Sequence, residues 1–333
     1  MFMKAYILRN FKEPPILSEV EKPRAAPGRA VVKVVAAGVC YRDYLALQGL
    51  QRVRLPATPG HEFAGVVEEV GEGVYGLQPG DAVAGMIFEY CGECDYCKSG
   101  REYLCRSRKI YGEDLPGAFA EHISADPRSL VKIPPGVPLE AASFAACVLS
   151  TVVRGMRKIG VKPGMQVLVT GAGGGVGIHA VQIAKAYGAR VIAVTSPAKA
   201  EAVAKYADHV VTGKAFSEEV KKLGGADGAI EAVGGPTLEQ TLRSLNWGAR
   251  VALIGNVDPQ PTPVALGILI LKEVEILPVI HGSREDLEEA LRLLAKGAVK
   301  PVYTVHSFSE LPRLLEETPK ASHVGRRVVR IGS

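Results

Sequence analysis

Four cysteines lie so close together in the chain that they suggest a metal site. They are Cys91, Cys94, Cys97 and Cys105. Gaps of two residues bring successive thiolates around one centre, and four sulfur ligands in a tetrahedron are typical of a closed structural zinc site. The alternatives are a disulfide cluster or free buried thiols, but the sequence shows no secretion signal, and disulfides are rare in the cytoplasm. We therefore predict a structural zinc lobe over residues 91–105.

A second set of potential metal ligands is spread over the first half of the chain: Cys40, His61, Glu62 and Cys147. Three protein ligands that leave a fourth position for a substrate oxygen are typical of a catalytic zinc site. Asp43 is expected to orient the ring of His61, and Glu62 to stand behind the metal or to exchange onto it. The alternative is that both cysteines are core thiols and that His61 is a hydrogen-bonded turn histidine. A nucleotide-binding loop shortly after Cys147 favours the metal.

The stretch from Met165 to Gly188 predicts that nucleotide-binding loop. A short apolar strand precedes a glycine-rich turn, and a helix that ends at Gly188 follows it. Glycines let the backbone approach a pyrophosphate, while exposed N–H groups and the helix N-terminus hold its charge. The residues assigned to this cradle are Ala172, Gly174, Gly175, Val176 and Gly177. A tight turn without a ligand is the alternative, and the strand and helix on either side argue against it.

The order of expected elements indicates an α/β protein of two domains. Short strands separated by Pro and Gly turns dominate up to about residue 133, and an unbroken helix that carries Cys147 is expected over 141–158. Strands and helices alternate beyond residue 165, which is typical of a doubly wound parallel sheet. We predict a β-rich catalytic domain from residues 1–147 and 283–333, and a Rossmann domain over residues 148–282.

Composition excludes several classes of function. The chain has 333 residues, of which 47% are hydrophobic and 23% are charged, and it carries a formal net charge of +5. The chain has neither the basic arm nor the aromatic-basic repeat that is typical of nucleic-acid binding, and no apolar run is long enough to span a membrane. We expect a soluble cytoplasmic protein that acts on small molecules.

The run Gly60-His61-Glu62-Phe63-Ala64-Gly65-Val66-Val67-Glu68-Glu69-Val70-Gly71 resembles the signature of zinc-containing alcohol dehydrogenases, in the medium-chain dehydrogenase/reductase superfamily. The resemblance extends over the whole chain. It implies a GroES-like catalytic domain formed from both chain ends and wrapped around a Rossmann domain, and commonly a tetramer. It also implies that Cys40, His61 and Cys147 bind the catalytic zinc next to Glu62, and that Thr151 and Arg326 touch the nicotinamide half of the cofactor.

The cofactor region departs from that of liver-type alcohol dehydrogenases and is more similar to that of quinone oxidoreductases. The strand after the glycine loop ends in Thr195-Ser196, where an acidic residue would bind the ribose 2′-hydroxyl of NAD. Without that carboxylate a 2′-phosphate is not repelled, and Ser196 and Lys199 can hold it. We therefore expect NADP(H) rather than NAD(H). The alternative is that Lys199 is solvated helix surface. Gly255 and Asn256 are further candidate cofactor contacts.

Arg42 is a further departure from the alcohol dehydrogenase pattern. Alcohol dehydrogenases of this family usually carry Ser or Thr at this position, where the hydroxyl relays the alcohol proton, and a guanidinium cannot do so at ordinary pH. The run Cys40-Tyr41-Arg42-Asp43 resembles acryloyl-CoA reductases, which reduce an activated C=C bond. Arg42 would then steady an enolate or a CoA phosphate, and Tyr41 would donate a proton. Alternatively, Arg42 only pairs with a nearby carboxylate.

Three hypotheses follow. The leading one is a zinc-dependent oxidoreductase that moves hydride between NADP(H) and a carbonyl or alcohol substrate. The second keeps the cofactor but reduces the double bond of an enoyl thioester such as acryloyl-CoA. The third is a nucleotide-binding protein without turnover, which the complete set of zinc ligands disfavours.

Overall fold

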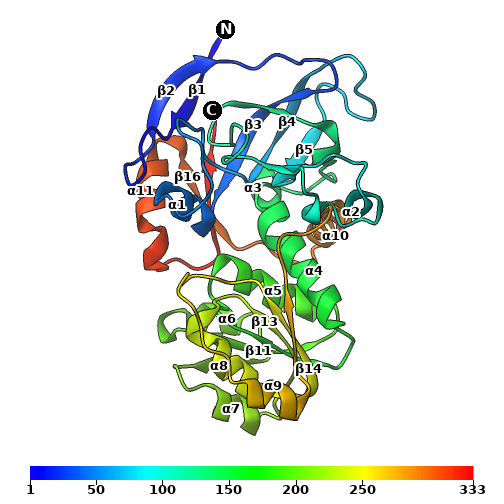
Figure 1. Ribbon diagram of the computed structural model, residues 1–333, viewed down its shortest axis with the longest axis vertical. Helices are drawn as coiled ribbons and strands as arrows, with labels where there is room; N and C mark the ends of the chain where they lie inside the picture. The colour runs from blue at the N-terminus through cyan, green and yellow to red at the C-terminus, as the bar shows by residue number, and fades with distance from the viewer. Residues whose placement is uncertain (333) are drawn as a thin grey trace.

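The computed structural model describes residues 1–332 and divides into two bodies, each built on its own sheet (Figure 1). The body that holds both chain ends contains a seven-stranded sheet in the order β16-β17-β3-β4-β5-β9, with β8 paired to β3. Its strands are β3 (Ala30–Val39), β4 (Phe63–Val70), β5 (Ala82–Gly85), β8 (His122–Ala125), β9 (Leu130–Lys132), β16 (Tyr303–Ser307) and β17 (Arg326–Arg330). Two small antiparallel pairs flank it, β1 (Phe2–Ile7) with β2 (Ile16–Glu21), and β6 (Phe88–Glu89) with β7 (Lys109–Ile110).

The other body is a parallel sheet of six strands in the order β12-β11-β10-β13-β14-β15. The strands are β10 (Gln166–Val169), β11 (Arg190–Thr195), β12 (His209–Thr212), β13 (Ala226–Glu231), β14 (Leu245–Leu253) and β15 (Glu275–Pro278). The connecting helices are α5 (Gly175–Ala186), α6 (Ala200–Ala204), α7 (Ser217–Lys222), α8 (Gly235–Ser244) and α9 (Leu266–Lys272). The predicted α/β fold with a doubly wound sheet is confirmed.

Alternate residues of the central strand β10 enter two different cores, which is why its last three residues are all apolar. Val167 and Val169 pack with α5 and with α4 (Ser150–Ile159) on one face, whereas Leu168 packs with α7 and α8 on the other. A strand covered by helices on both faces needs a continuous apolar run rather than an alternating one. All four residues of β10 are buried.

The end of the chain returns to the first sheet. After α10 (Arg284–Ala295) the chain forms β16, then α11 (Leu311–Glu317), and finally β17, which pairs antiparallel with β3. Strand β17 therefore lies beside the strand that leads into Cys40, although almost three hundred residues separate them in sequence. This pairing carries Arg326 to the interior of the molecule.

The single helix predicted over residues 141–158 is wrong, because the structure interrupts it. Helix α3 (Leu139–Ser143) stops at Phe144, a π-turn follows over Ala145–Leu149, and α4 then continues to Ile159. Insertions of this kind are frequent at functional sites, and Cys147 lies in the middle of this one. The alanine-rich sequence is compatible with either form of helix, so composition did not reveal the change.

The remaining elements are short. They are α1 (Tyr41–Leu47), α2 (Asp95–Lys98) and the 3-10 turns Glu102–Leu104, Pro127–Ser129, Pro197–Lys199, Phe308–Glu310 and Thr318–Lys320. Within residues 1–332, no helix combines the length and the apolar character needed to span a bilayer.

Candidate catalytic metal site and cofactor cradle

Four side chains from three separate segments meet beside the end of β3. One ligand atom from each of Cys40, His61, Glu62 and Cys147 lies within 4.8 Å of all the others. The two Sγ atoms are 3.9 Å apart, and His61 Nε2 is 3.8 Å from Glu62 Oε1. These separations are too long for strong mutual hydrogen bonds but suit atoms arranged around a common ion.

Asp43 fixes two of these ligands at once. Its Oδ2 accepts from the backbone N–H of Cys40 at 2.9 Å, which caps α1, and its Oδ1 lies 2.9 Å from Nδ1 of His61. The contact that the sequence predicts between Asp43 and His61 is therefore present. Since Nδ1 is engaged by the carboxylate, Nε2 is the nitrogen left to bind a metal. That Nε2 is buried and has no hydrogen-bond partner among residues 1–332, and so the ring fits a metal ligand.

Glu62 is fully buried and is neutralised by Arg326. The Arg326 Nε donates to Glu62 Oε2 at 3.1 Å, and its Nη2 contacts Oε1. Burial raises the pKa of Glu62 to about 7, against the opposing charge of Arg326. A Cβ at Gly38 would lie 1.9 Å from Glu62 Oε2, so only glycine leaves room for this carboxylate beneath β3. Glu62 is thus held by Arg326 next to the other three ligands.

The pKa values of the two thiols depend on each other and on neighbouring groups. The neighbouring Cys147 thiol, through its contact with the Cys40 sulfur, lowers the pKa of Cys40 well below its usual value, although burial opposes the shift. The same contact and burial raise the pKa of Cys147 well above its usual value. Burial disfavours a charged His61 ring, but Asp43 outweighs it and raises the pKa of His61. A divalent cation would bind both thiolates and the neutral imidazole without this competition for protons.

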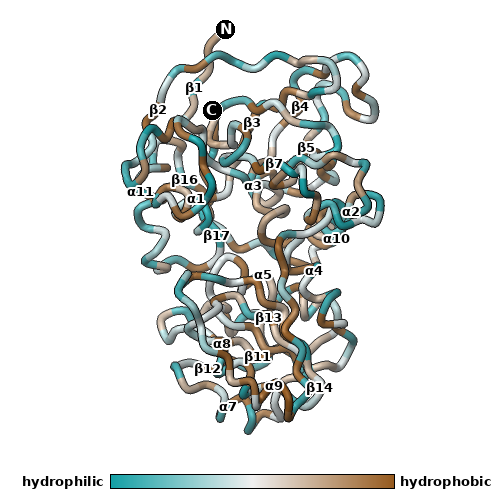
Figure 2. The backbone as a smooth tube through the Cα atoms, in the orientation of Figure 1, coloured by the Kyte–Doolittle hydropathy of each residue, from teal (hydrophilic) through white to brown (hydrophobic). Residues whose placement is uncertain are grey.

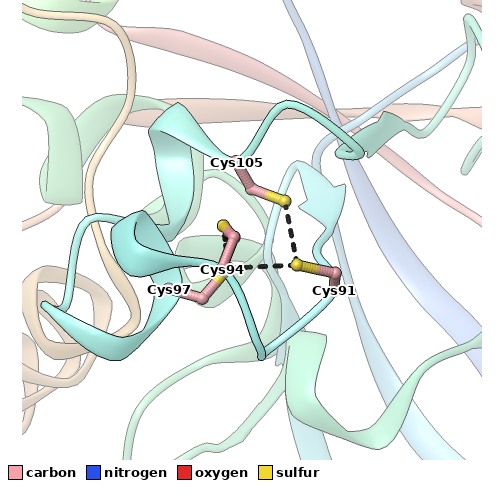
Figure 3. A group of neighbouring side chains, drawn as sticks. All are labelled: Cys91, Cys94, Cys97 and Cys105. Carbon is pink, nitrogen blue, oxygen red and sulfur yellow. Dashed lines mark hydrogen bonds between the residues drawn. The ribbon is translucent and has the colours of Figure 1, made fainter.

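The four-cysteine lobe forms a second cluster, and its sulfur atoms point toward one another (Figure 3). The Sγ separations are 3.5 Å from Cys94 to Cys97, 3.6 Å from Cys105 to Cys91, and 3.8 Å from Cys91 to Cys97. All six cysteines are free thiols, which rules against the disulfide alternative. Backbone N–H groups of Glu93 and Cys94 lower the pKa of Cys91 to about 6. The donor set fits a closed site of four thiolates.

The glycine loop after β10 lies at the carboxyl end of the parallel sheet, where such folds bind nucleotides. A Cβ at Gly177 would lie 2.2 Å from the Gly171 carbonyl oxygen, so glycine is required for the helix to start this close to the loop. The backbone N–H of Gly325 donates to the Gly173 carbonyl at 3.2 Å. The loop is therefore covered by the segment that leads into β17.

Side chains that suit a bound nucleotide surround this loop. Thr195 Oγ1 and the Lys199 side chain lie so close to Gly173 that a Cβ at this position would come within 3 Å of both. Arg326 lies against Gly175. Thr151 Oγ1 is buried with no hydrogen-bond partner among residues 1–332. A buried hydroxyl without a partner and a glycine cradle at a helix N-terminus both fit a dinucleotide cofactor.

Comparison with known proteins agrees with this geometry. Residues 26–135 match the alcohol dehydrogenase GroES-like domain, and residues 175–296 match the zinc-binding dehydrogenase domain. The chain is 46% identical over 329 residues to the acryloyl-coenzyme A reductase of Metallosphaera sedula, covering 97% of this chain and 98% of that protein. It is 36% identical over 338 residues to an alcohol dehydrogenase of Geobacillus stearothermophilus, covering 99% of this chain and 100% of that one. The crystal structure of AibC superimposes with a TM-score of 0.94 at 37% identity, covering 100% and 96% of the two chains.

The chain belongs to the zinc-type alcohol dehydrogenase family. The predicted family resemblance, which includes a likeness to acryloyl-CoA reductases, is thus confirmed. Membership makes the protein an oxidoreductase that is expected to use zinc and a nicotinamide cofactor on a small-molecule substrate.

Within this family member, Tyr41 and Arg42 point to partners other than the ligand cluster. The Arg42 guanidinium donates to both oxygens of Glu113, at 2.6 and 3.0 Å. The Tyr41 hydroxyl donates to the Val257 carbonyl at 2.9 Å. Arg42 thus has the carboxylate partner that the sequence analysis left open, and Tyr41 links α1 to the loop after β14.

The other predicted cofactor residues lie at the same edge of the parallel sheet. Thr195 ends β11 and is buried, whereas Ser196 is exposed. Lys199 is partly buried and donates to the Ala321 carbonyl at 2.5 Å, so it is not simply solvated helix surface. Gly255 packs against Ala232, and Asn256 is exposed next to it, both just after β14.

His281 is a candidate site residue that the sequence analysis missed. It follows β15, has a φ of +74°, and its Nε2 is buried without a partner among residues 1–332. Burial, then the charges of Arg42, His61 and Arg108, lower its pKa to about 3. A histidine directly after a strand on the ligand-binding edge of a doubly wound sheet was the available signal.

Proposed function

We propose that the protein is a zinc-dependent, NADP(H)-linked reductase that reduces the activated C=C bond of an enoyl thioester such as acryloyl-CoA. The observation that carries the proposal is Arg42, which replaces the proton-relaying hydroxyl and is held by Glu113. The acryloyl-coenzyme A reductase relative, at 46% identity over nearly the whole chain, supports it. Reduction of a C=C bond has no alcohol proton to relay, so loss of the hydroxyl costs this reaction nothing.

The residues of the site would divide the work as follows. Cys40, His61 and Cys147 would hold the zinc, which when bound supplies Lewis acidity toward the thioester carbonyl, while the reduced nicotinamide supplies hydride. Hydride would add to the β-carbon, and a proton would be taken up at the α-carbon. Asp43 keeps His61 in the tautomer that binds metal, and Arg326 neutralises Glu62 behind it. The net change is one enoyl thioester and NADPH, with one proton, to the saturated thioester and NADP⁺.

We further propose a preference for NADP(H) over NAD(H). No carboxylate ends β11, and Lys199 lies over the glycine loop with only a backbone carbonyl as its partner. A ribose 2′-phosphate would offer this ammonium a charged partner in place of a neutral one. The test is the ratio of kcat/KM for NADPH to that for NADH, which should exceed 10 and should fall about tenfold in Lys199→Ala.

The central test supplies NADPH and zinc-replete protein with acryloyl-CoA and, separately, with a panel of aldehydes and ketones. We expect propionyl-CoA as the product, identified by mass spectrometry, and loss of turnover with a chelator. An alcohol product with the C=C bond intact, or turnover confined to the carbonyl panel, would reject the enoyl reaction.

Hydride transfer between NADP(H) and a carbonyl or alcohol is the second candidate. The match to alcohol dehydrogenases over the full length of the chain favours it. The double variant Arg42→Thr/Glu113→Gln places a hydroxyl at the relay position without leaving a carboxylate unpaired. If alcohols are the natural substrates, this variant should oxidise them no better than the native protein does.

We also propose that the protein is a homo-oligomer, with a tetramer as the expected state. Strand β15 is an edge of the six-stranded sheet, and α9, which is coloured as hydrophobic in Figure 2, lies next in the chain before it. Helix α9 exposes Leu266, Ile270 and Leu271. Exposed apolar side chains gathered on one helix are typical of an interface. The variant Leu266→Lys/Ile270→Lys should lower the mass measured by light scattering, and an unchanged mass would contradict this assignment.

A further inference from the structure

An open hollow of about 620 Å³ lies next to Arg42. One wall comes from the turn after α1, and the other from the segment that follows the last cysteine of the lobe. The charged residues that line it are Arg42, Arg52, Arg106, Arg108, Glu113 and Asp114.

The hollow has an excess of positive charge. Glu113 is already paired with Arg42, and Asp114 Oδ2 accepts from the backbone N–H of Ile110 at 3.0 Å. Among residues 1–332, none of the ion pairs involves Arg52, Arg106 or Arg108. The only side-chain hydrogen bond of Arg108 in that range is a long one, 3.4 Å to the Cys105 carbonyl. Three guanidinium groups therefore have no carboxylate to neutralise them.

Arg42 connects the hollow to the catalytic ligands. The backbone N–H of Arg42 donates to Cys40 Sγ at 3.5 Å, while its side chain lines the hollow. The glycine loop, which would hold the cofactor phosphates, belongs to the other sheet and has Lys199 and Arg326 beside it. The arginines of the hollow are thus a second cationic region, in the body that carries the metal ligands.

We propose that this hollow binds the phosphate groups of the coenzyme A part of the substrate. The proposal rests on the enoyl-thioester function, because a ligand anchored here would lead its acyl end past Arg42 to the metal. Coenzyme A carries a 3′-phosphate and a diphosphate on a long uncharged arm, which separates the anionic end from the reacting bond. Guanidinium groups bind phosphate oxygens through paired N–H donors, so three of them suit several phosphates better than a single carboxylate.

The first test measures binding without chemistry. Desulfo-coenzyme A lacks the thiol, so it cannot ligate the zinc, and its affinity for the holoenzyme with NADP⁺ can be measured by calorimetry. The variant Arg52→Gln/Arg106→Gln/Arg108→Gln should bind it at least about tenfold more weakly, as expected for the loss of charged hydrogen bonds. Arg190→Gln, an exposed arginine at the start of β11, is the matched control and should bind it normally. Equal affinity in the triple variant, or no binding to the native protein, would overturn the proposal.

The second test separates this proposal from the proposed function. Acryloyl-CoA and acryloyl-pantetheine carry the same reacting group, but only the first has the nucleotide phosphates. The triple variant should raise KM for acryloyl-CoA about tenfold and leave kcat/KM for acryloyl-pantetheine unchanged. Normal turnover of both thioesters by the triple variant rejects the phosphate site but keeps the function. Weakened desulfo-coenzyme A binding, in a protein that reduces neither thioester, supports the site and rejects the function.

Discussion

The two cysteine clusters use the same chemistry but are built in different ways. The lobe draws its four ligands from one continuous segment, whose first and last cysteines are 14 residues apart. The catalytic cluster draws its ligands from β3, the turn before β4 and the π-turn, so that Cys40 and Cys147 are 107 residues apart. The lobe needs a metal to hold a loop together, whereas the catalytic cluster is positioned by the seven-stranded sheet, by the π-turn and by charged neighbours. Local folding and catalysis should therefore respond differently to the loss of each metal.

Removing a catalytic ligand should have the largest effect. In Cys147→Ser we expect kcat/KM to fall at least about a thousandfold, since Lewis acid stabilisation of several kcal/mol is lost. Zinc content should fall from two ions to one, and the melting temperature should change little because the seven-stranded sheet and the π-turn position this cluster. Elemental analysis and thermal melts check both points. A large loss of stability would break the contrast with the lobe.

Arg326 supplies the charged support that the lobe does not have. Arg326→Gln should destabilise the protein by about 3–5 kcal/mol, because the buried carboxylate of Glu62 loses its partner. Urea unfolding gives this value. The double variant Arg326→Gln/Glu62→Gln should recover most of the loss, since it no longer buries an unpaired charge. Without such recovery, the ion pair would not be the source of the effect.

The opposite pattern is expected for the lobe. Cys97→Ser should release one zinc and lower the free energy of unfolding by about 3 kcal/mol, the linkage expected for a metal present at a hundred times its dissociation constant. The activity of the remaining folded protein should stay within about twofold, because no lobe cysteine belongs to the catalytic group. Activity assays below the melting temperature, normalised to folded protein, provide the check. A thousandfold loss of kcat would show that the lobe shapes the catalytic site directly.

A smaller, pH-dependent effect tests how the two bodies are joined. His179 on α5 donates through Nδ1 to the Gly175 carbonyl, and its Nε2 accepts from the backbone N–H of Val302 in the other body. Burial lowers the pKa of His179 to about 4. The unfolded chain takes up this proton near pH 6.5, whereas the folded chain does not. The contribution of His179 to the free energy of unfolding is therefore fully present above pH 6.5 and is lost as the pH falls toward 4. The loss attributable to this residue is about 2 kcal/mol at pH 5.

In His179→Gln the fall in stability between pH 7 and pH 5 should be smaller by about that amount. His209→Gln, which changes an exposed histidine at the start of β12, is the matched control and should follow the native curve. Urea unfolding at each pH gives both curves. Identical curves for the native protein and His179→Gln would remove His179 as the cause.

Features carried by local sequence were predictable, and features that depend on distant contacts were not. The parallel sheet, the glycine loop and the four-cysteine lobe follow from spacing and apolar pattern, whereas the catalytic cluster was predicted from its ligand types and from the family resemblance. The pairing of Arg42 with Glu113 joins residues 71 positions apart, and no pattern connects them. His281 was missed because its buried Nε2 and left-handed backbone are properties of packing rather than of composition. The π-turn was missed because the alanine-rich run suits a regular helix equally well.

That π-turn makes the metal site sensitive to the length of the chain as well as to the identity of its residues. Each residue turns an α-helix by about 100°, so the deletion of one alanine from Ala145–Leu149 would restore a regular helix and rotate Cys147 away from Cys40. All four ligands would still be present in the sequence, and the aligned motifs would look intact. A homologue with one residue fewer at this point would have to be judged by its helical phase, not by its cysteine.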